Sequence, residues 1–192
     1  MNFLFFLNAI LLGVGLAMDA FSVSLANGLN EPHMKKDRQF LIAGTFSFFQ
    51  IAMPLIGWFC VHTLVEKFQL FQKYIPYIAL ILLAYIGGKM LIEGIKNKEN
   101  NDEKPALTLY DLFIQGVATS IDALSVGFTI AELSFPFALV ESIIIGIVTL
   151  GICLVGLHLG KKFGTKLANK ASILGGIILI GIGLEIFLKG IL

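Results

Sequence analysis

The sequence predicts an all-α integral membrane protein in which six transmembrane helices form two inverted three-helix repeats. Of its 192 residues, 57% are hydrophobic and only 14% are charged, whereas a soluble domain carries about 25% charge. Most charges lie between apolar blocks of about 20 residues, the length that a helix needs to cross about 30 Å of hydrocarbon. In addition, one acid-containing motif occurs twice, once in each half of the chain. Composition, spacing and repetition together support this fold class.

Each apolar block is expected to be a helix, because a segment in lipid must bond its own backbone groups and the alternating pattern of a barrel strand is absent. The first block lacks the basic start of a signal peptide and contains Asp19, so we expect it to be retained as a span. The six predicted spans cover residues of about 3–27, 40–62, 74–95, 109–131, 136–158 and 171–191.

A polar segment at residues 96–108 divides the chain nearly in half. We therefore expect residues 1–95 to be the first repeat, 96–108 a cytoplasmic linker and 109–192 the second repeat. The loops after the first, third and fifth spans hold ten Lys and Arg residues, and the opposite loops hold three. Since basic loops stay in the cytoplasm, both termini are predicted to lie outside a multi-pass cell (plasma or inner) membrane.

The two halves repeat one motif, Asp-Ala-Phe/Leu-Ser-Val, beginning at Asp19 in the first span and at Asp122 in the fourth, an offset of 103 residues. An odd number of spans per copy makes the two copies insert in opposite senses. Inverted repeats are a transporter architecture with the binding site near the midplane. Two weaker matches support the duplication: Pro54-Leu-Ile-Gly57 with Val148-Thr-Leu-Gly151 at an offset of 94, and Gly87 and Gly94 with Gly183 and Gly190 at an offset of 96.

Each Asp is predicted to lie on a polar stripe of its helix, because residues three, four and seven apart share a face. An acid inside a membrane costs about 2.5–3.5 kcal/mol and normally faces a partner or a watery cavity. The stripe in the first span comprises Asn8, Gly15, Asp19, Ser22 and Ala26, and the stripe in the fourth comprises Gln115, Thr119, Asp122, Val126 and Thr129, with Ser125 at its margin.

The two acids are interpreted as a shared cation site that also binds protons. A single intramembrane Asp could be protonated and serve only to join helices, but two facing carboxylates repel unless a proton or a cation lies between them. The proposed metal ligands are Asp19, Asp122, Gln50, Ser22, Thr119 and Ser125, and the same two Asp residues would carry the proton coupling.

Secondary candidates flank this set. Pro54 leaves the carbonyl of Gln50 without its helical donor, so Gln50 could offer two oxygens; a kink with a satisfied Gln is an equally good reading. Met18 and Met53 lie close to the predicted site, and one thioether would favour Mn²⁺ over Mg²⁺. Glu93 lies four residues after Lys89, a spacing typical of an ion pair at a membrane surface. Oxygen ligands suit a hard divalent ion.

Several motifs in order resemble the MntP family of manganese efflux pumps, and the resemblance covers essentially the whole chain. It implies a six-span bacterial membrane protein that exports Mn²⁺ from the cytoplasm and depends on the acids corresponding to Asp19 and Asp122. The motifs are Met18-Asp-Ala-Phe-Ser22, Met53-Pro-Leu-Ile-Gly-Trp58, Gly87-Gly-Lys-Met-Leu-Ile-Glu-Gly94, Ala118-Thr-Ser-Ile-Asp-Ala123 and Ile173-Leu-Gly-Gly176.

The expected function is therefore Mn²⁺ export as an antiporter with inward protons, with Mn²⁺ as substrate, no cofactor and no enzymatic activity. A net charge of +1 argues against a nucleic-acid partner, and the partners expected are the ion and the lipid bilayer. A homo-oligomer is left open. Two alternatives remain: a six-span exporter of another divalent cation or of an amino acid, and a non-transporting membrane scaffold whose polar residues only join helices.

Overall fold

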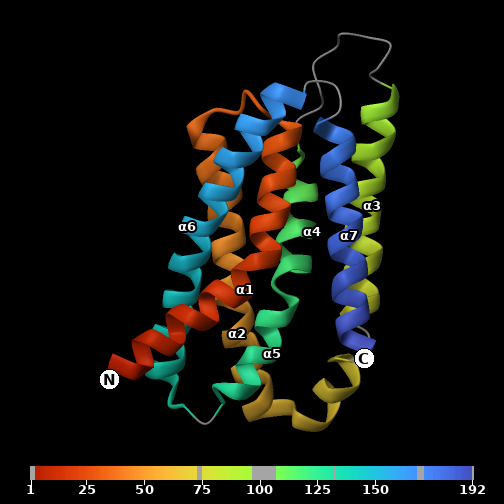
Figure 1. Ribbon diagram of the computed structural model, residues 1–192. Helices are drawn as coiled ribbons and strands as arrows, with labels where there is room; N and C mark the ends of the chain where they lie inside the picture. Colours follow the sequence, from red (N-terminus) through yellow and green to blue (C-terminus); the bar gives the residue numbers. More distant parts are fainter. Residues whose placement is uncertain (1–2, 73–74, 97–106, 132, 168–170, 192) are drawn as a thin grey trace.

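A computed structural model describes residues 3–72, 75–96, 107–131, 133–167 and 171–191. The regular secondary structure in these ranges is entirely helical, without a strand, which confirms the all-α part of the prediction (Figure 1). The helices are α1 (Phe3–Asn30), α2 (Lys36–Gln72), α3 (Ile75–Lys96), α4 (Leu109–Thr119), α5 (Ile121–Thr129), α6 (Phe135–Leu167) and α7 (Ala171–Ile191).

Within the described residues, three segments are both long and apolar enough to cross a bilayer, namely Phe3–Asn30, Lys36–Val61 and Phe135–Gly164, and Ile173–Ile182 is a shorter apolar stretch. Their outward faces carry large apolar side chains such as Phe48. Exposed apolar surface on this scale is unfavourable in water and suits lipid. The chain is accordingly an integral membrane protein.

The helices differ from the predicted spans in two ways: two helices are longer than predicted, and one span is broken. α2 and α6 continue past the apolar limits at residues 62 and 158, because the apolar run measures only the part that lipid covers and a helix can continue into water. The predicted fourth span, 109–131, is two helices that meet at Ser120. No Gly or Pro marks that break in the sequence.

Close helix crossings hold the bundle together, and small residues make the following three of them possible. α1 crosses α6 where Gly156 meets the carbonyl of Phe21, and α2 crosses α5 where Gly57 meets the carbonyl of Leu124. Because a Cβ on either Gly would collide with backbone, these helices approach at main-chain distance. α3 and α7 run side by side at one edge of the bundle (Figure 1) and meet through Gly87 and Gly176.

Two groups of buried apolar side chains fill the bundle. The larger includes residues from α1, α2, α3, α4, α6 and α7, with Phe46 and Leu157 fully buried within it. The smaller contains Leu16, Ala123 and Ile145, with Met53 packed against it. This smaller cluster joins α1, α2, α5 and α6 next to the two predicted acids.

Candidate cation site

The break in the fourth span begins with the side chain of Ser120. Its hydroxyl donates to the Gly116 carbonyl at 2.7 Å, and its N–H donates to the Val117 carbonyl at 3.2 Å. A Ser side chain that bonds a carbonyl four residues earlier offers the backbone an alternative to the regular helix. α5 then starts at Ile121, which places Asp122 in its first turn. A carboxylate is favourable there because the N-terminal end of a helix is positive.

The side chain of Asp122 turns back on the start of α5. Its Oδ1 accepts the backbone N–H of Ala123 at 2.8 Å. In an unbroken helix, that N–H would be the donor to the carbonyl of Thr119, four residues earlier. The Thr119 carbonyl accepts a bond from elsewhere, from the Gln50 side chain.

Gln50 joins the two Asp-bearing segments through its amide group. Its Nε2 donates to the carbonyl of Leu16 at 3.2 Å and to the carbonyl of Thr119 at 3.1 Å. Leu16 lies three residues before Asp19, and Thr119 lies three residues before Asp122. The two carbonyl oxygens are therefore no farther apart than the sum of these distances. The main chains of α1 and α4 meet within one helical turn of each acid.

The other end of the same amide is unsatisfied. Gln50 is 0% exposed, and its Oε1 is buried without a hydrogen-bond partner among the described residues. A buried acceptor without a donor costs about 1–3 kcal/mol, so buried polar groups of this kind call for an explanation. A cation bound beside this oxygen would remove the penalty.

The two acids differ in exposure. Asp19 is half-buried, and Asp122 is exposed. The predicted stripes hold only in part, since Asn8 and Gly15 on the Asp19 stripe are exposed, and the buried face of α1 is instead the one that carries Ala17 and Ala20. The acids thus lie at the edge of the packed core, next to the smaller apolar cluster.

The three predicted hydroxyl ligands lie close to the acids along the chain. Thr119 is buried and its Oγ1 donates to the Gln115 carbonyl at 2.9 Å, while Ser22 Oγ donates to the Met18 carbonyl at 3.0 Å. Each hydroxyl keeps lone pairs for a further partner after donating its proton. Ser125 is exposed on α5.

The secondary candidates are dispersed. Met53 packs against the smaller apolar cluster, whereas the side chain of Met18 is 47% exposed. Pro54 is buried inside an unbroken α2, and its carbonyl lies against Gly127 of α5. The side chain of Glu93 lies outside the described part of the structure.

Among the described residues, no three His, Cys, Asp or Glu side chains gather where they could hold a metal. A divalent ion at this place would need neutral oxygens besides the two carboxylates, from amide, hydroxyl or main-chain groups. Such ligands bind hard cations.

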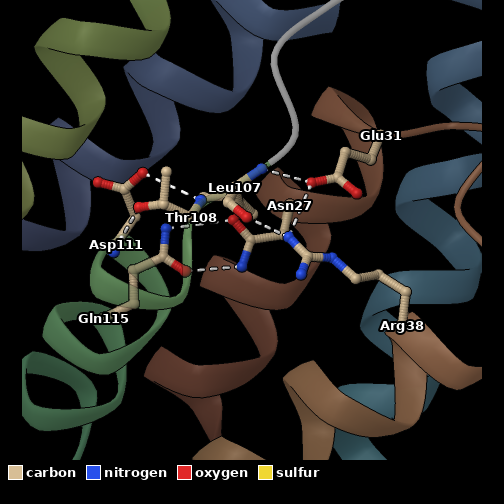
Figure 2. Close-up of polar contacts among 7 residues, drawn as sticks. All are labelled: Asn27, Glu31, Arg38, Leu107, Thr108, Asp111 and Gln115. Carbon is tan, nitrogen blue, oxygen red and sulfur yellow. Dashed lines mark hydrogen bonds and ion pairs between the residues drawn. The ribbon is translucent and has the colours of Figure 1, made fainter.

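Sequence reasoning missed two polar residues, Ser120 and Asn27. Ser120 breaks the helix beside Asp122, and its signal was the run of side chains that can bond the backbone from Thr119 to Asp122. Asn27 of α1 forms a reciprocal pair with Gln115 of α4, in which Asn27 Nδ2 donates at 2.7 Å and Gln115 Nε2 donates at 3.2 Å (Figure 2). A contact between two distant helices has no local sequence signal.

Apolar helices packed at main-chain distance around a polar centre, with two acids beside a broken helix, define a polytopic helical membrane protein. Comparison with known sequences identifies the family of membrane proteins to which the chain belongs. A family model described as "Putative manganese efflux pump" matches residues 33–187, and the chain belongs to this family.

Curated relatives with that same description, followed by the name MntP, match nearly end to end. The relative from Rippkaea orientalis is 41% identical over 97% of both chains, and that from Sorangium cellulosum is 39% identical over 94% of both. A relative from Clostridium botulinum is 41% identical over 94% of this chain and 92% of its own. No solved structure matches the chain.

Proposed function

We propose that this protein exports Mn²⁺ from the cytoplasm, in exchange for protons, through a site built on Asp19 and Asp122. The observation that carries the proposal is the Gln50 amide, which bonds the main chain one turn before each acid and keeps a buried, unpartnered oxygen. The names of the relatives support manganese as the substrate. The site supplies the hard oxygen ligands that such an ion needs.

Proton exchange follows from the energy that export requires. Moving a divalent ion outward against an inside-negative potential of 100 mV costs about 4.6 kcal/mol before any concentration gradient. Two carboxylates can hold either the metal or protons but not both at once, because bound metal disfavours the protonated forms. This competition is the minimal requirement for exchange.

Inverted repeats would let the site open alternately to the two sides by rocking, and the helix crossings support this architecture. Gly57 meets Leu124 and Gly127, while Gly156 meets Phe21 and Ser24. These two sets of contacts are equivalent. Phe21 and Ser24 of α1 correspond to Leu124 and Gly127 at an offset of 103 residues, and Gly57 of α2 corresponds to Gly156 of α6 at an offset of 99. Such an exchange of partners is expected if two similar three-helix units pack around an approximate two-fold axis.

The contacts also support a particular register for the proposed repeats. Gly87 meets Gly176 and Ile180, while Gly176 meets Gly87 and Leu91, so these helices pair at an offset of 89. An offset of 89 differs from the 94 and 96 of the weaker sequence matches, whereas the offset of 103 agrees with the crossings of α1 and α5. Glycines recur so often in these spans that chance alignments compete with the correct one.

In the proposed repeats, Gln50 would lie on the approximate two-fold axis. The carbonyls that it bonds belong to Leu16 and Thr119, which are 103 residues apart and therefore equivalent. Its own counterpart, at an offset of 99, is Thr149, which is buried and bonds the Ile145 carbonyl of its own helix. One repeat alone would thus supply the central amide.

The direct test is Mn²⁺ uptake into inside-out membrane vesicles that contain the protein. An imposed proton gradient, acidic inside the vesicle, should accelerate uptake, and collapse of the gradient should slow it. Vesicles from cells without the protein are the control. Uptake that ignores the gradient would remove the proton-coupling half of the proposal, and absence of uptake would remove the transport half.

Replacing Gln50 with Leu should weaken Mn²⁺ binding by about ten- to a hundredfold, because a contact between an amide oxygen and an ion is worth about 1.5–3 kcal/mol. Binding would be measured by titration of the purified protein in detergent. Gln39→Leu is the matched control, since the Gln39 side chain, within the described part of the chain, bonds the nearby Met34 carbonyl at 3.4 Å. Equal affinity of the two variants would exclude Gln50 as a ligand.

A further inference from the structure

We propose that the Asn27–Gln115 amide pair is a gate that closes the ion path at the linker end of the bundle, defined as the end where α3 stops at Lys96 and Leu107 precedes α4. The gate opens once in each transport cycle. This inference rests on the proposed function, because it takes the two Asp residues to be the site behind the gate.

The pair lies between the linker end and the acids. In α1, Asn27 lies eight residues after Asp19. Gln115 of α4 lies seven residues before Asp122, which is in the first turn of α5. At 1.5 Å per residue, the pair is about 10–12 Å from the acids along the helices. Both amides are 0% exposed, and each donates to the other. An ion that entered from the linker end between α1 and α4 would meet this pair before it reached the acids.

A second layer of contacts covers the pair from outside. Glu31 Oε1 accepts the backbone N–H of Leu107 at 2.6 Å and lies 3.5 Å from Arg38 Nη2, which also donates to the Leu107 carbonyl (Figure 2). The turn after α1, the start of α2 and the start of α4 are thereby tied together. Lys161 of α6 adds a bond of 2.6 Å to the Met34 carbonyl.

The chemistry of the pair suits a gate. Two hydrogen bonds between neutral amides contribute about 1 kcal/mol each after exchange with water, so the pair can open at a small free-energy cost. A neutral gate neither repels Mn²⁺ nor retains it as an acid would, and its two amide oxygens can coordinate a passing hard cation. Opening would convert a mutual contact into two oxygen ligands.

The amide pair has no counterpart at the equivalent positions of the other repeat. The repeat equivalents of Gln115 and Asn27 are Leu12 and Ile130, which are apolar and cannot form such a pair. Along the fourth span, Gln115 and Thr119 are buried whereas Asp122 and Ser125 are exposed. On this proposal, the structure is the conformation closed at the linker end, where the described residues place the amide pair.

A reducible cross-link tests whether the gate moves. Asn27 and Gln115 are both replaced by Cys in a chain carrying Cys60→Ser and Cys153→Ala, and a short bis-methanethiosulfonate reagent bridges the two positions. Cross-linking should lower Mn²⁺ uptake into inside-out vesicles at least tenfold, and reductant should restore it. The two single-Cys chains treated identically are the controls. If the bridged protein transports as fast as the unbridged one, the pair is static packing and the proposal fails.

A second measurement needs no transport. In a chain that carries only Cys60→Ser and Cys153→Ala, Ser22→Cys adds a single thiol beside the proposed site. Its rate of reaction with a membrane-impermeant thiol reagent, applied at the linker side, reports access to the site. Adding Asn27→Ala should accelerate labelling at least threefold, whereas Thr149→Val, which alters a buried polar residue away from the pair, should leave it unchanged. An unchanged rate with Asn27→Ala overturns the gate even if the protein moves no Mn²⁺, so failure of the gate and failure of the proposed function are distinguishable.

Discussion

Asp19→Asn and Asp122→Asn are each expected to reduce Mn²⁺ export by on the order of a hundredfold. Asn keeps the size and the hydrogen-bonding capacity of Asp but lacks its charge, and losing one of two carboxylate ligands costs about 3 kcal/mol or more of ion binding, equivalent to about a hundredfold. The same change removes a group that binds protons, so exchange fails as well. Uptake into inside-out vesicles, normalised to the amount of protein, measures the effect.

Asp37→Asn is the matched control, because Asp37 lies exposed in the first turn of α2, away from the acid pair. It should transport normally. The experiment also separates the candidate functions. A scaffold in which Asp19 and Asp122 only join helices predicts that both variants keep full activity, and an amino-acid exporter predicts that Mn²⁺ tolerance is unaffected while efflux of the amino acid changes.

The all-α class could be predicted from the sequence, because the length of an apolar run reflects the thickness of the bilayer. The starts of α4 and α7, at Leu109 and Ala171, agree with the predicted spans. The capping box between Thr108 and Asp111 shows why α4 starts there, since each residue bonds the backbone N–H of the other. A local signal of this kind can be found in a single sequence.

The break at Ser120 and the register of the repeats could not be predicted in this way. Side chains around Ser120 can bond the backbone locally, but the same residues fit a helix as well as a break. Gln50, a residue of another helix, bonds the Thr119 carbonyl that the break leaves free. Similarly, Gln115 was placed on the stripe of Asp122, but its partner Asn27 is 88 residues away in the chain. Tertiary contacts of this kind decide the detail of the site.

Gly127→Ala is expected to cause a large loss of folded protein. A Cβ at Gly127 would lie 2.5 Å from the Gly57 Cα and 2.6 Å from the Pro54 carbonyl oxygen, both of which are main-chain atoms of α2. Backbone cannot move aside as a flexible side chain can, so α5 and α2 must separate. We expect a cost of about 3 kcal/mol or more, which corresponds to a fall of about 10 °C in Tm. Thermal unfolding followed by size-exclusion chromatography in detergent measures it.

Gly44→Ala is the matched control, because a Cβ at Gly44 of α2 would meet no atom within 4 Å. It should leave Tm unchanged or raise it slightly, since Ala favours a helix by about 1 kcal/mol over Gly. If Gly127→Ala were as stable as Gly44→Ala, α5 would not be held against α2 at main-chain distance. Asp122 would then lack its fixed position relative to Gln50, and the geometry that supports the cation site would be lost with it.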